Sequence, residues 1–164
     1  MDVSSITCAT GGRGDETLMH TESSILISAP MADVFGMTSD LIRWPAFLSH
    51  YRWVRWIDGG PNQGVVEMAA MRGGIPIRWV SEFRREAGKP ELWFRHLSAF
   101  TKGMEVRWIY EQRASGVLIT IDHSLRFRWP LLASIAEPLI GDFMIGWVAP
   151  RTLTGFKELL EKTP

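Results

Sequence analysis

The sequence has little of what would place it outside the cell or in a membrane. Its single cysteine, Cys8, excludes an internal disulfide and is compatible with a reducing compartment. Residues 1–18 have neither the basic start nor the apolar run of a signal peptide. No later segment has the unbroken apolar length needed to cross a bilayer. We therefore predict a cytoplasmic location and no membrane span.

Net charge and several chemistry-bearing motifs are missing as well. The chain has 18 basic and 18 acidic residues, so its bulk charge does not point to nucleic acid as a partner. It contains no G-x-G-x-x-G, no phosphate-binding loop and no G-x-S-x-G nucleophile elbow. Close His/His or His/carboxylate pairs at ligand spacing and a CxxC motif are also absent. We predict no metal site and no cofactor.

What the chain does have is aromatic and thioether bulk. Eight tryptophans and eight methionines occur in 164 residues, which suits either a roomy apolar pocket or simply a large core. No linker or composition shift divides the chain, so we predict one domain over residues 19–164. Residues 1–18 are rich in Ser, Thr, Gly and Asp and are predicted to form a disordered leader.

The middle of the chain is a series of strands. Six stretches of alternating character (50–58, 63–72, 75–86, 91–100, 104–113 and 117–127) are separated by GGPN, GG, AGKP, TKG and ASG, which are typical hairpin breaks. Before them, a strand around 25–27 leads to Pro30, which suits the first turn of a short helix. Ser39-Asp40 should cap a second short helix, which Trp44-Pro45 should end.

The C-terminal part changes to a helical pattern. Apolar residues recur at helical spacing from Phe143 to Leu160, and we predict a long helix over about 139–162. Pro138 should separate it from a shorter piece, and Pro150 should kink it. An antiparallel sheet followed by one long helix indicates an α+β fold.

Strand alternation assigns side chains to an inner and an outer face. Each inner row is largely apolar: Ile75, Ile77, Trp79, Ser81 and Phe83; Leu92, Phe94 and His96; Met104, Val106, Trp108 and Tyr110; and Val117, Ile119, Ile121, His123, Leu125 and Phe127. His123 and His96 are polar members of these rows. Either is explained by a satisfied core histidine or by a functional group facing a pocket.

The segment Ile25–Tyr51, ILISAPMADVFGMTSDLIRWPAFLSHY, resembles the first part of the helix-grip fold of the START (SRPBCC) superfamily. This superfamily includes polyketide cyclases, coenzyme-Q-binding proteins and ligand carriers similar to pollen allergens. Within it, T-S-D-L-x-x-W-P-x-F-L-S-x-Y looks most like the single-domain aromatase/cyclases. The resemblance implies a curved antiparallel sheet of about seven strands around a long C-terminal helix, with two short helices after the first strand.

The resemblance also implies site residues. Tyr51 and Arg72 match positions from which aromatase/cyclases project a Tyr and an Arg into their cavity. The plain alternatives are a strand-edge tyrosine in water and a solvated arginine beside a turn. With His123 they form the predicted catalytic set. The predicted ligand-binding residues are Trp79, Trp108, Tyr110, His96, Phe143 and Trp147.

Three functions are compatible with these residues. The first is a cyclase/aromatase (dehydratase) that acts on a poly-β-ketone or related aromatic polyketide, with an acyl carrier protein as a candidate partner. The second is a non-catalytic carrier of a quinone, lipid or other hydrophobic small molecule. A ribosome- or membrane-associated protein of the same fold is a third, against which the neutral charge argues.

Overall fold

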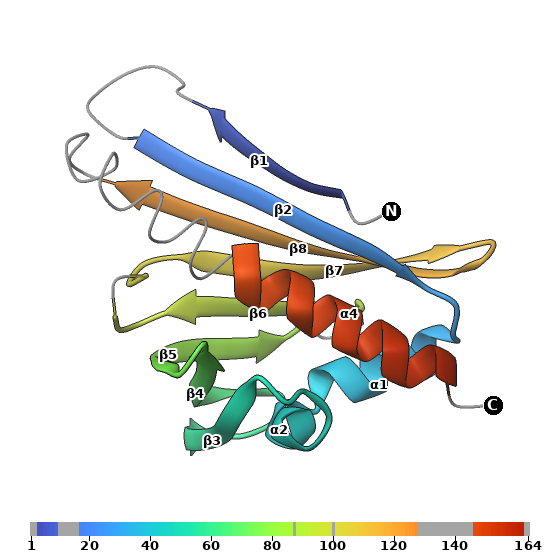
Figure 1. Ribbon diagram of the computed structural model, residues 1–164, viewed down its shortest axis with the longest axis horizontal. Helices are drawn as coiled ribbons and strands as arrows, with labels where there is room; N and C mark the ends of the chain where they lie inside the picture. Colours follow the sequence, from blue (N-terminus) through green and yellow to red (C-terminus); the bar gives the residue numbers. More distant parts are fainter. Residues whose placement is uncertain (1–2, 10–16, 87, 100, 128–145, 163–164) are drawn as a thin grey trace.

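The computed structural model describes residues 3–9, 17–86, 88–99, 101–127 and 146–162. Its strands form one antiparallel sheet in the order β1-β2-β8-β7-β6-β5-β4-β3 (Figure 1). The strands are β1 (Val3–Ala9), β2 (Thr17–Ile27), β3 (Tyr51–Gly59), β4 (Gln63–Arg72), β5 (Ile75–Arg85), β6 (Glu91–His96), β7 (Glu105–Arg113) and β8 (Gly116–Phe127). Hairpins connect neighbouring strands from β3 to β8, and β2 pairs with β8.

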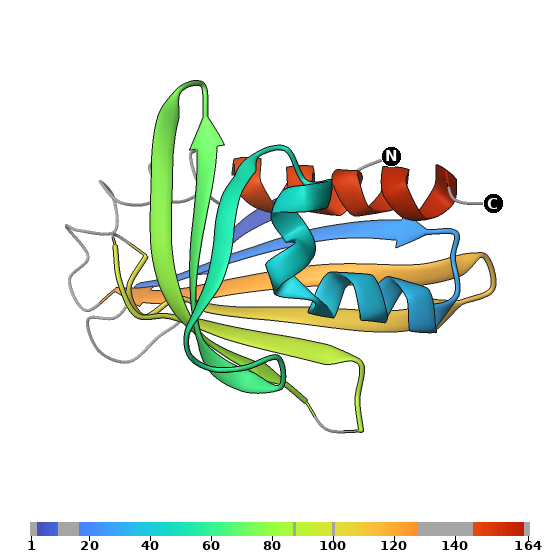
Figure 2. The same cartoon turned by 90° about the horizontal axis from the view of Figure 1, so that it is seen from below.

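The helices lie on one side of this sheet. They are α1 (Met31–Ser39), the 3-10 turn η1 (Leu41–Arg43), α2 (Trp44–Phe47) and α4 (Gly146–Lys162). Figure 2 shows that β4 and β5 curl toward the side on which the helices lie, so that the sheet wraps around α4. The predicted helix-grip fold is confirmed. The predicted long helix is present from Gly146 onward, and residues 139–145 lie outside the described residues.

Within the described residues the sheet has eight strands, where about seven were predicted. The additional strand, β1, lies in the segment 1–18 that was predicted to be disordered, and β2 also begins within that segment at Thr17. β1 pairs with β2 from Val3 opposite Ser24 to Ala9 opposite Leu18. Backbone hydrogen bonds do not depend on an apolar side-chain pattern, so a Ser- and Thr-rich segment can add a strand to an open edge.

The chain around Trp44 also differs from the prediction. Trp44 has helical angles (φ −52°, ψ −43°), and Pro45 lies in the first turn of α2 instead of ending a helix. The Trp44 side chain is fully buried, and its indole nitrogen donates a 3.1 Å hydrogen bond to the Thr38 carbonyl. Burial and this hydrogen bond outweigh the extended preference of a residue before proline.

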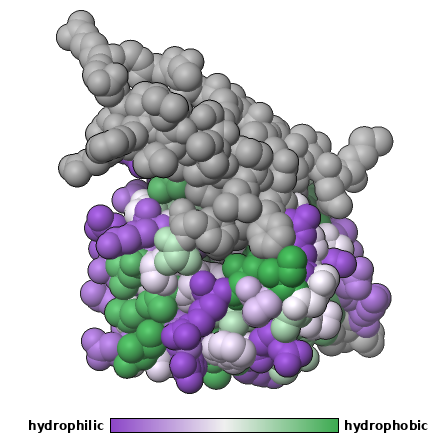
Figure 3. Space-filling view, turned by 60° about the vertical axis from the view of Figure 1, so that its left-hand side comes forward, coloured by the Kyte–Doolittle hydropathy of each residue, from purple (hydrophilic) through white to green (hydrophobic). Residues whose placement is uncertain are grey.

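The inner rows predicted from alternation are largely buried. Ile77, Trp79, Ser81 and Phe83 of β5 are buried, whereas Ile75 is 54% exposed because it lies at the tip of the β4–β5 hairpin. The other large exposed apolar residues are scattered over several elements. Figure 3 shows one face of the molecule, on which the apolar side chains of the coloured residues form separate groups among polar ones.

Among the residues that the structure describes, the outer face of the sheet contains one buried carboxylate. Glu67 of β4 is fully buried and forms ion pairs with Arg55 of β3 and Arg78 of β5, and the Trp53 indole donates a 3.3 Å hydrogen bond to it. Burial raises the pKa of Glu67, but the hydrogen bonds from Arg55 and Trp53 and the two positive charges outweigh burial and lower it. This cluster joins three strands on the side opposite α4.

Candidate active site

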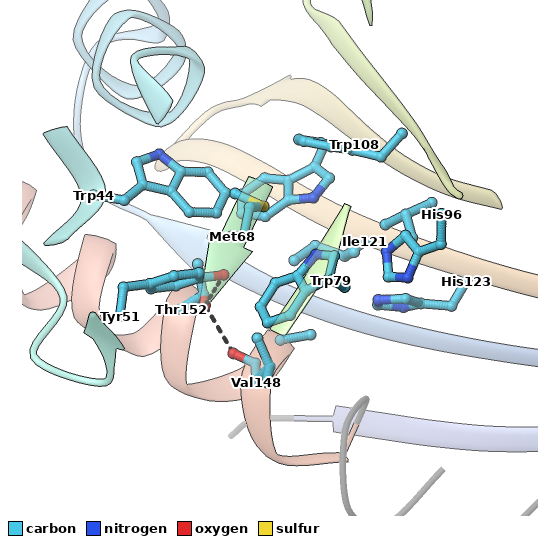
Figure 4. A pocket seen from close by; sticks show the side chains of 13 residues that line it. Trp44, Tyr51, Met68, Trp79, His96, Trp108, Ile121, His123, Val148 and Thr152 are labelled. Atoms are coloured by element: carbon cyan, nitrogen blue, oxygen red, sulfur yellow. Dashed lines mark hydrogen bonds between the residues drawn. The ribbon is translucent and has the colours of Figure 1, made fainter. Parts of the chain in front are cut away.

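A cavity of about 60 Å³ lies between the inner face of the sheet and α4. Its walls are mainly aromatic, with Trp44 from α2, Trp79 from β5, Phe94 from β6 and Trp108 from β7. Four polar side chains also line it, namely Tyr51, His96, His123 and Thr152. Figure 4 shows Tyr51 and Thr152 at one end and the two histidines at the other, with Trp79 between them.

The structure brings together five of the predicted site residues. Tyr51, Trp79, His96, Trp108 and His123 all line this cavity and are all buried. They come from five different strands of the sheet, so the curvature of the sheet, and not closeness in sequence, assembles the site. The positions of Trp79, His96, Trp108 and His123 agree with the inner rows expected from strand alternation, whereas Tyr51 was expected from the family resemblance.

Tyr110 is buried but does not line the cavity. Its hydroxyl forms a 2.8 Å hydrogen bond with the Thr38 hydroxyl, and its ring meets Phe35 edge-on at 5.1 Å between centroids. Burial raises its pKa, although the hydrogen bond with Thr38 opposes this. Tyr110 therefore fixes α1 against β7. Alternation placed it on the correct face, but it could not show that α1 covers that end of the row.

Arg72 and Trp147 lie beside the cavity instead of lining it. Arg72 is the last residue of β4 and is half-buried, and its guanidinium carbon is 5.8 Å from the centroid of the Trp147 ring. Arg151 approaches the same ring at 5.1 Å. Trp147 in turn meets the His50 ring edge-on at 5.7 Å. Phe143, predicted as part of the opposite wall, lies outside the described residues.

Two residues at the tyrosine end were not predicted. Thr152 of α4 accepts or donates a 3.0 Å hydrogen bond with Nε2 of His50, and its Oγ1 lies 3.4 Å from the Tyr51 hydroxyl oxygen. His50 precedes β3 and lies in a turn, so strand alternation does not apply to it. The sequence shows only that His50 is next to Tyr51. That both side chains reach Thr152 becomes visible only once α4 is placed.

The histidine end is polar but uncharged. Nδ1 of His96 is 2.7 Å from the Thr101 hydroxyl, and the His96 ring stacks on Trp79 at 6.2 Å between centroids. Nδ1 of His123 is buried and has no hydrogen-bond partner among the described residues. Burial lowers the pKa of His96 to about 4. Burial, with smaller effects from His96 and His20, lowers the pKa of His123 to about 3, so both imidazoles are neutral at pH 7.

The cavity therefore offers neutral hydrogen-bonding groups at two ends of an aromatic space. Burial raises the pKa of Tyr51, and the hydrogen bond with Thr152 opposes this only in part. Tyr51 is a hydrogen-bond donor at pH 7, and a neutral imidazole can both donate and accept. Among the described residues no group of three or more His, Cys, Asp or Glu side chains could hold a metal ion. No helix in the described part of the chain is long and apolar enough to span a membrane.

Comparison with known proteins places this architecture in a family. A sequence model of the family described as "Polyketide cyclase / dehydrase and lipid transport" matches residues 27–144. The chain is 33% identical over 105 residues to a provisionally named polyketide cyclase of Streptomyces halstedii, covering 61% of this chain and 94% of that protein. A provisionally named polyketide cyclase of Streptomyces cyaneus is 33% identical over 102 residues, which is 59% of this chain and 66% of that protein. The chain belongs to the polyketide cyclase/dehydrase family.

Solved structures share the fold. The Zhui aromatase/cyclase from Streptomyces sp. R1128 superposes with a TM-score of 0.75 at 13% identity, covering 88% of this chain and 94% of that one. A START superfamily protein from Mycobacterium smegmatis gives a TM-score of 0.67 at 10% identity, covering 88% of this chain and 99% of the other. At these identities the likeness establishes the fold alone.

Proposed function

We propose that the protein is a cyclase/aromatase (dehydratase) that acts on a poly-β-ketone or related aromatic polyketide. Family membership supports the reaction class. The observation that carries the proposal is the cavity itself, in which Tyr51 and two neutral histidines lie at opposite ends of an aromatic space. A flat molecule with oxygen atoms at both ends matches that distribution of apolar and polar groups.

Ring closure needs a proton to leave a carbon that lies between two carbonyl groups. We assign this proton to the neutral imidazole of His123, whose Nδ1 has no partner among the described residues. The enolate carbon then bonds to a second carbonyl carbon, and the Tyr51 hydroxyl donates its proton to that carbonyl oxygen. The imidazolium returns its proton to the new hydroxyl, which leaves as water. As the carbon–carbon double bond forms, the imidazole takes the second proton of the former enolate carbon and releases it to water, which balances the proton that Tyr51 has given up. The low pKa of His123 favours rapid return of the proton, because an isolated imidazolium is poorly stabilised in the cavity.

Arg72 has a separate role in this proposal. Ring contacts lead from Arg72 through Trp147 and His50 to Tyr51, with the Tyr51 and His50 rings 4.7 Å apart. We assign Arg72 to the part of the substrate that extends beyond the tyrosine end, where its positive charge would stabilise carbonyl or enolate oxygens. Trp79, Trp108 and His96 would contact the bound part of the chain. Delivery by an acyl carrier protein stays a prediction.

The substrate must enlarge the cavity when it binds. A volume of about 60 Å³ holds a few water molecules, whereas pockets for small organic ligands are typically about 300–1,000 Å³. Met68 lines the cavity and has an unbranched, flexible side chain, so it is the residue we expect to move first. Positioning a flexible chain in such a space can itself contribute several kcal/mol to ring closure.

The proposal is tested by turnover of a synthetic poly-β-ketone thioester. We expect Tyr51→Phe and His123→Gln to lower kcat by about 100-fold, which is typical of losing a general acid or base. Arg72→Ala should also lower kcat, while binding of an aromatic product analogue persists. The matched controls are Tyr110→Phe, which removes a buried hydroxyl outside the cavity, and His20→Gln on the outer face.

Two outcomes would contradict the proposal. If the three variants turn over the thioester as fast as the unmutated protein, these residues do not carry the reaction. If the unmutated protein binds the aromatic analogue tightly but forms no ring, the protein is a carrier of hydrophobic small molecules, which the same aromatic walls would serve.

A further inference from the structure

We infer that Thr152 and His50 form a proton relay that connects the buried Tyr51 hydroxyl to a groove on the outside of the molecule. This inference rests on the proposed function, because it concerns the return of a proton to Tyr51 after Tyr51 has donated one. Neither residue touches the substrate in this scheme. Thr152 positions and reprotonates Tyr51, and His50 supplies Thr152.

The hydrogen bonds of Thr152 define the relay. Its Oγ1 lies 2.8 Å from the Val148 carbonyl oxygen, 3.4 Å from the Tyr51 hydroxyl oxygen and 3.0 Å from Nε2 of His50. A threonine hydroxyl has one hydrogen, so it can donate to Val148 or to Tyr51 but not to both. The 2.8 Å contact with the Val148 carbonyl is the shortest of the three, and with its hydrogen directed there Thr152 accepts from His50. On this basis we assign the Nε2–H tautomer to His50.

His50 reaches both the interior and the outside. His50 is 9% exposed, and its imidazole contacts Thr152 on the interior side. It also lines a groove of about 590 Å³ between the α2–β3 connection and α4, together with residues such as Ser49 and Arg151. With Nε2–H directed to Thr152, Nδ1 is the nitrogen that can take up a proton.

The chemistry of Tyr51 creates the need for this path. Its ring is enclosed by Trp44 at 5.2 Å and by His50 at 4.7 Å between centroids, and no charged side chain of the described residues lines the cavity. A phenolate left there after proton transfer would be poorly solvated. Rapid reprotonation restores the neutral hydroxyl and prepares the site for another cycle.

The Tyr51 O–H bond breaks as its proton goes to the substrate oxygen. The Thr152 hydroxyl turns from the Val148 carbonyl to the phenolate and gives it a proton, and Thr152 takes the Nε2 proton of His50. The imidazole takes a proton at Nδ1 from water in the groove and leaves hydroxide there. The imidazole is then the Nδ1–H tautomer, and it returns to Nε2–H by exchanging protons with groove water before the next turnover. The hydroxide is neutralised by the proton that His123 releases. Burial, and then the charge of Arg151, lower the pKa of His50 to about 4, so the imidazole is neutral in both tautomers.

The first test uses turnover of the same poly-β-ketone thioester. Thr152→Val removes the hydroxyl with little change in volume, and we expect kcat to fall about 10- to 100-fold with little change in KM. Thr152→Ser keeps the hydroxyl and should recover most of the loss. His50→Ala should show a similar fall in kcat, and added imidazole should restore part of it, because the groove beside His50 is open. A purely structural role would not respond to imidazole.

The second test does not depend on turnover. Nitrogen NMR of the four histidines, with His50→Ala as the assignment control, should show His50 as the Nε2–H tautomer. That signal should change in Thr152→Val and persist in Thr152→Ser. An Nδ1–H tautomer overturns the relay.

Failure of the relay and failure of the proposed function give different results. If Tyr51→Phe lowers turnover but Thr152→Val and His50→Ala do not, the relay is wrong and the proposed function stands. If the unmutated protein forms no product, the proposed function fails and the histidine tautomer alone decides whether the hydrogen-bonded chain exists.

Discussion

At the scale of single residues, the outer face of the sheet depends on a carboxylate that has no role in the cavity. Glu67 is buried between Arg55 and Arg78, which are themselves more than half exposed. We expect Glu67→Gln to lower the free energy of unfolding at pH 7 by about 1–3 kcal/mol, because charge-assisted hydrogen bonds are lost. Urea unfolding measures this. The control is Glu111→Gln, which removes an exposed partner of Arg113 and should change stability by less than about 0.5 kcal/mol.

The pH dependence of this effect has a definite sign. The folded pKa of Glu67 lies below its ordinary value of 4.5. The stability that its charge contributes is therefore fully present above pH 4.5 and is lost as the pH falls below that value. The difference in free energy of unfolding between the unmutated protein and Glu67→Gln should therefore become smaller in acid. An unchanged difference at pH 7 and pH 3.5 would contradict the role given to the charge.

At the scale of elements, the β7–β8 hairpin approaches the end of β2 so closely that only glycine fits. Gly116 has φ +140°, and a Cβ there would lie 2.1 Å from the Ile27 carbonyl oxygen. We expect Gly116→Ala to destabilise the protein by more than about 1 kcal/mol, as measured by thermal or urea unfolding. The control is Gly36→Ala, since Gly36 lies in α1 and its Cβ would meet nothing within 4 Å. This substitution should be neutral or stabilising. If Gly116→Ala and Gly36→Ala change the free energy of unfolding equally, the close approach of Gly116 to Ile27 does not restrict that position to glycine.

Sequence patterns predicted the elements that have a strong side-chain period and missed those that depend on context. The hairpins from β3 to β8 and the inner positions of Trp79, Trp108 and His123 follow from alternation and turn residues. Strand β1 does not, because edge pairing uses the backbone. Alternation could not find His50 or Thr152, since one lies in a turn and the other on a helix, and only the folded chain brings their side chains together.

At the scale of the whole molecule, enclosing three imidazoles makes folding sensitive to acid. Burial lowers the pKa values of His50 and His96 to about 4 and that of His123 to about 3. The unfolded chain binds these protons near the ordinary pKa of 6.5, so it holds more protons than the folded chain between that pH and the folded values. The part of the free energy of unfolding that depends on these neutral histidines is therefore fully present above pH 6.5, and it falls as the pH decreases toward 4.

Each histidine should contribute about 1.4 kcal/mol per pH unit to this fall, so three together give a slope of about 4 kcal/mol per unit near pH 5. Urea unfolding at pH 7, 6 and 5 measures the slope. His123→Gln replaces one titrating group by a neutral amide and should reduce the slope by about a third, and adding His96→Gln should reduce it again by a similar amount. Equal slopes in the unmutated protein and both variants would show that these imidazoles are not held neutral by the fold.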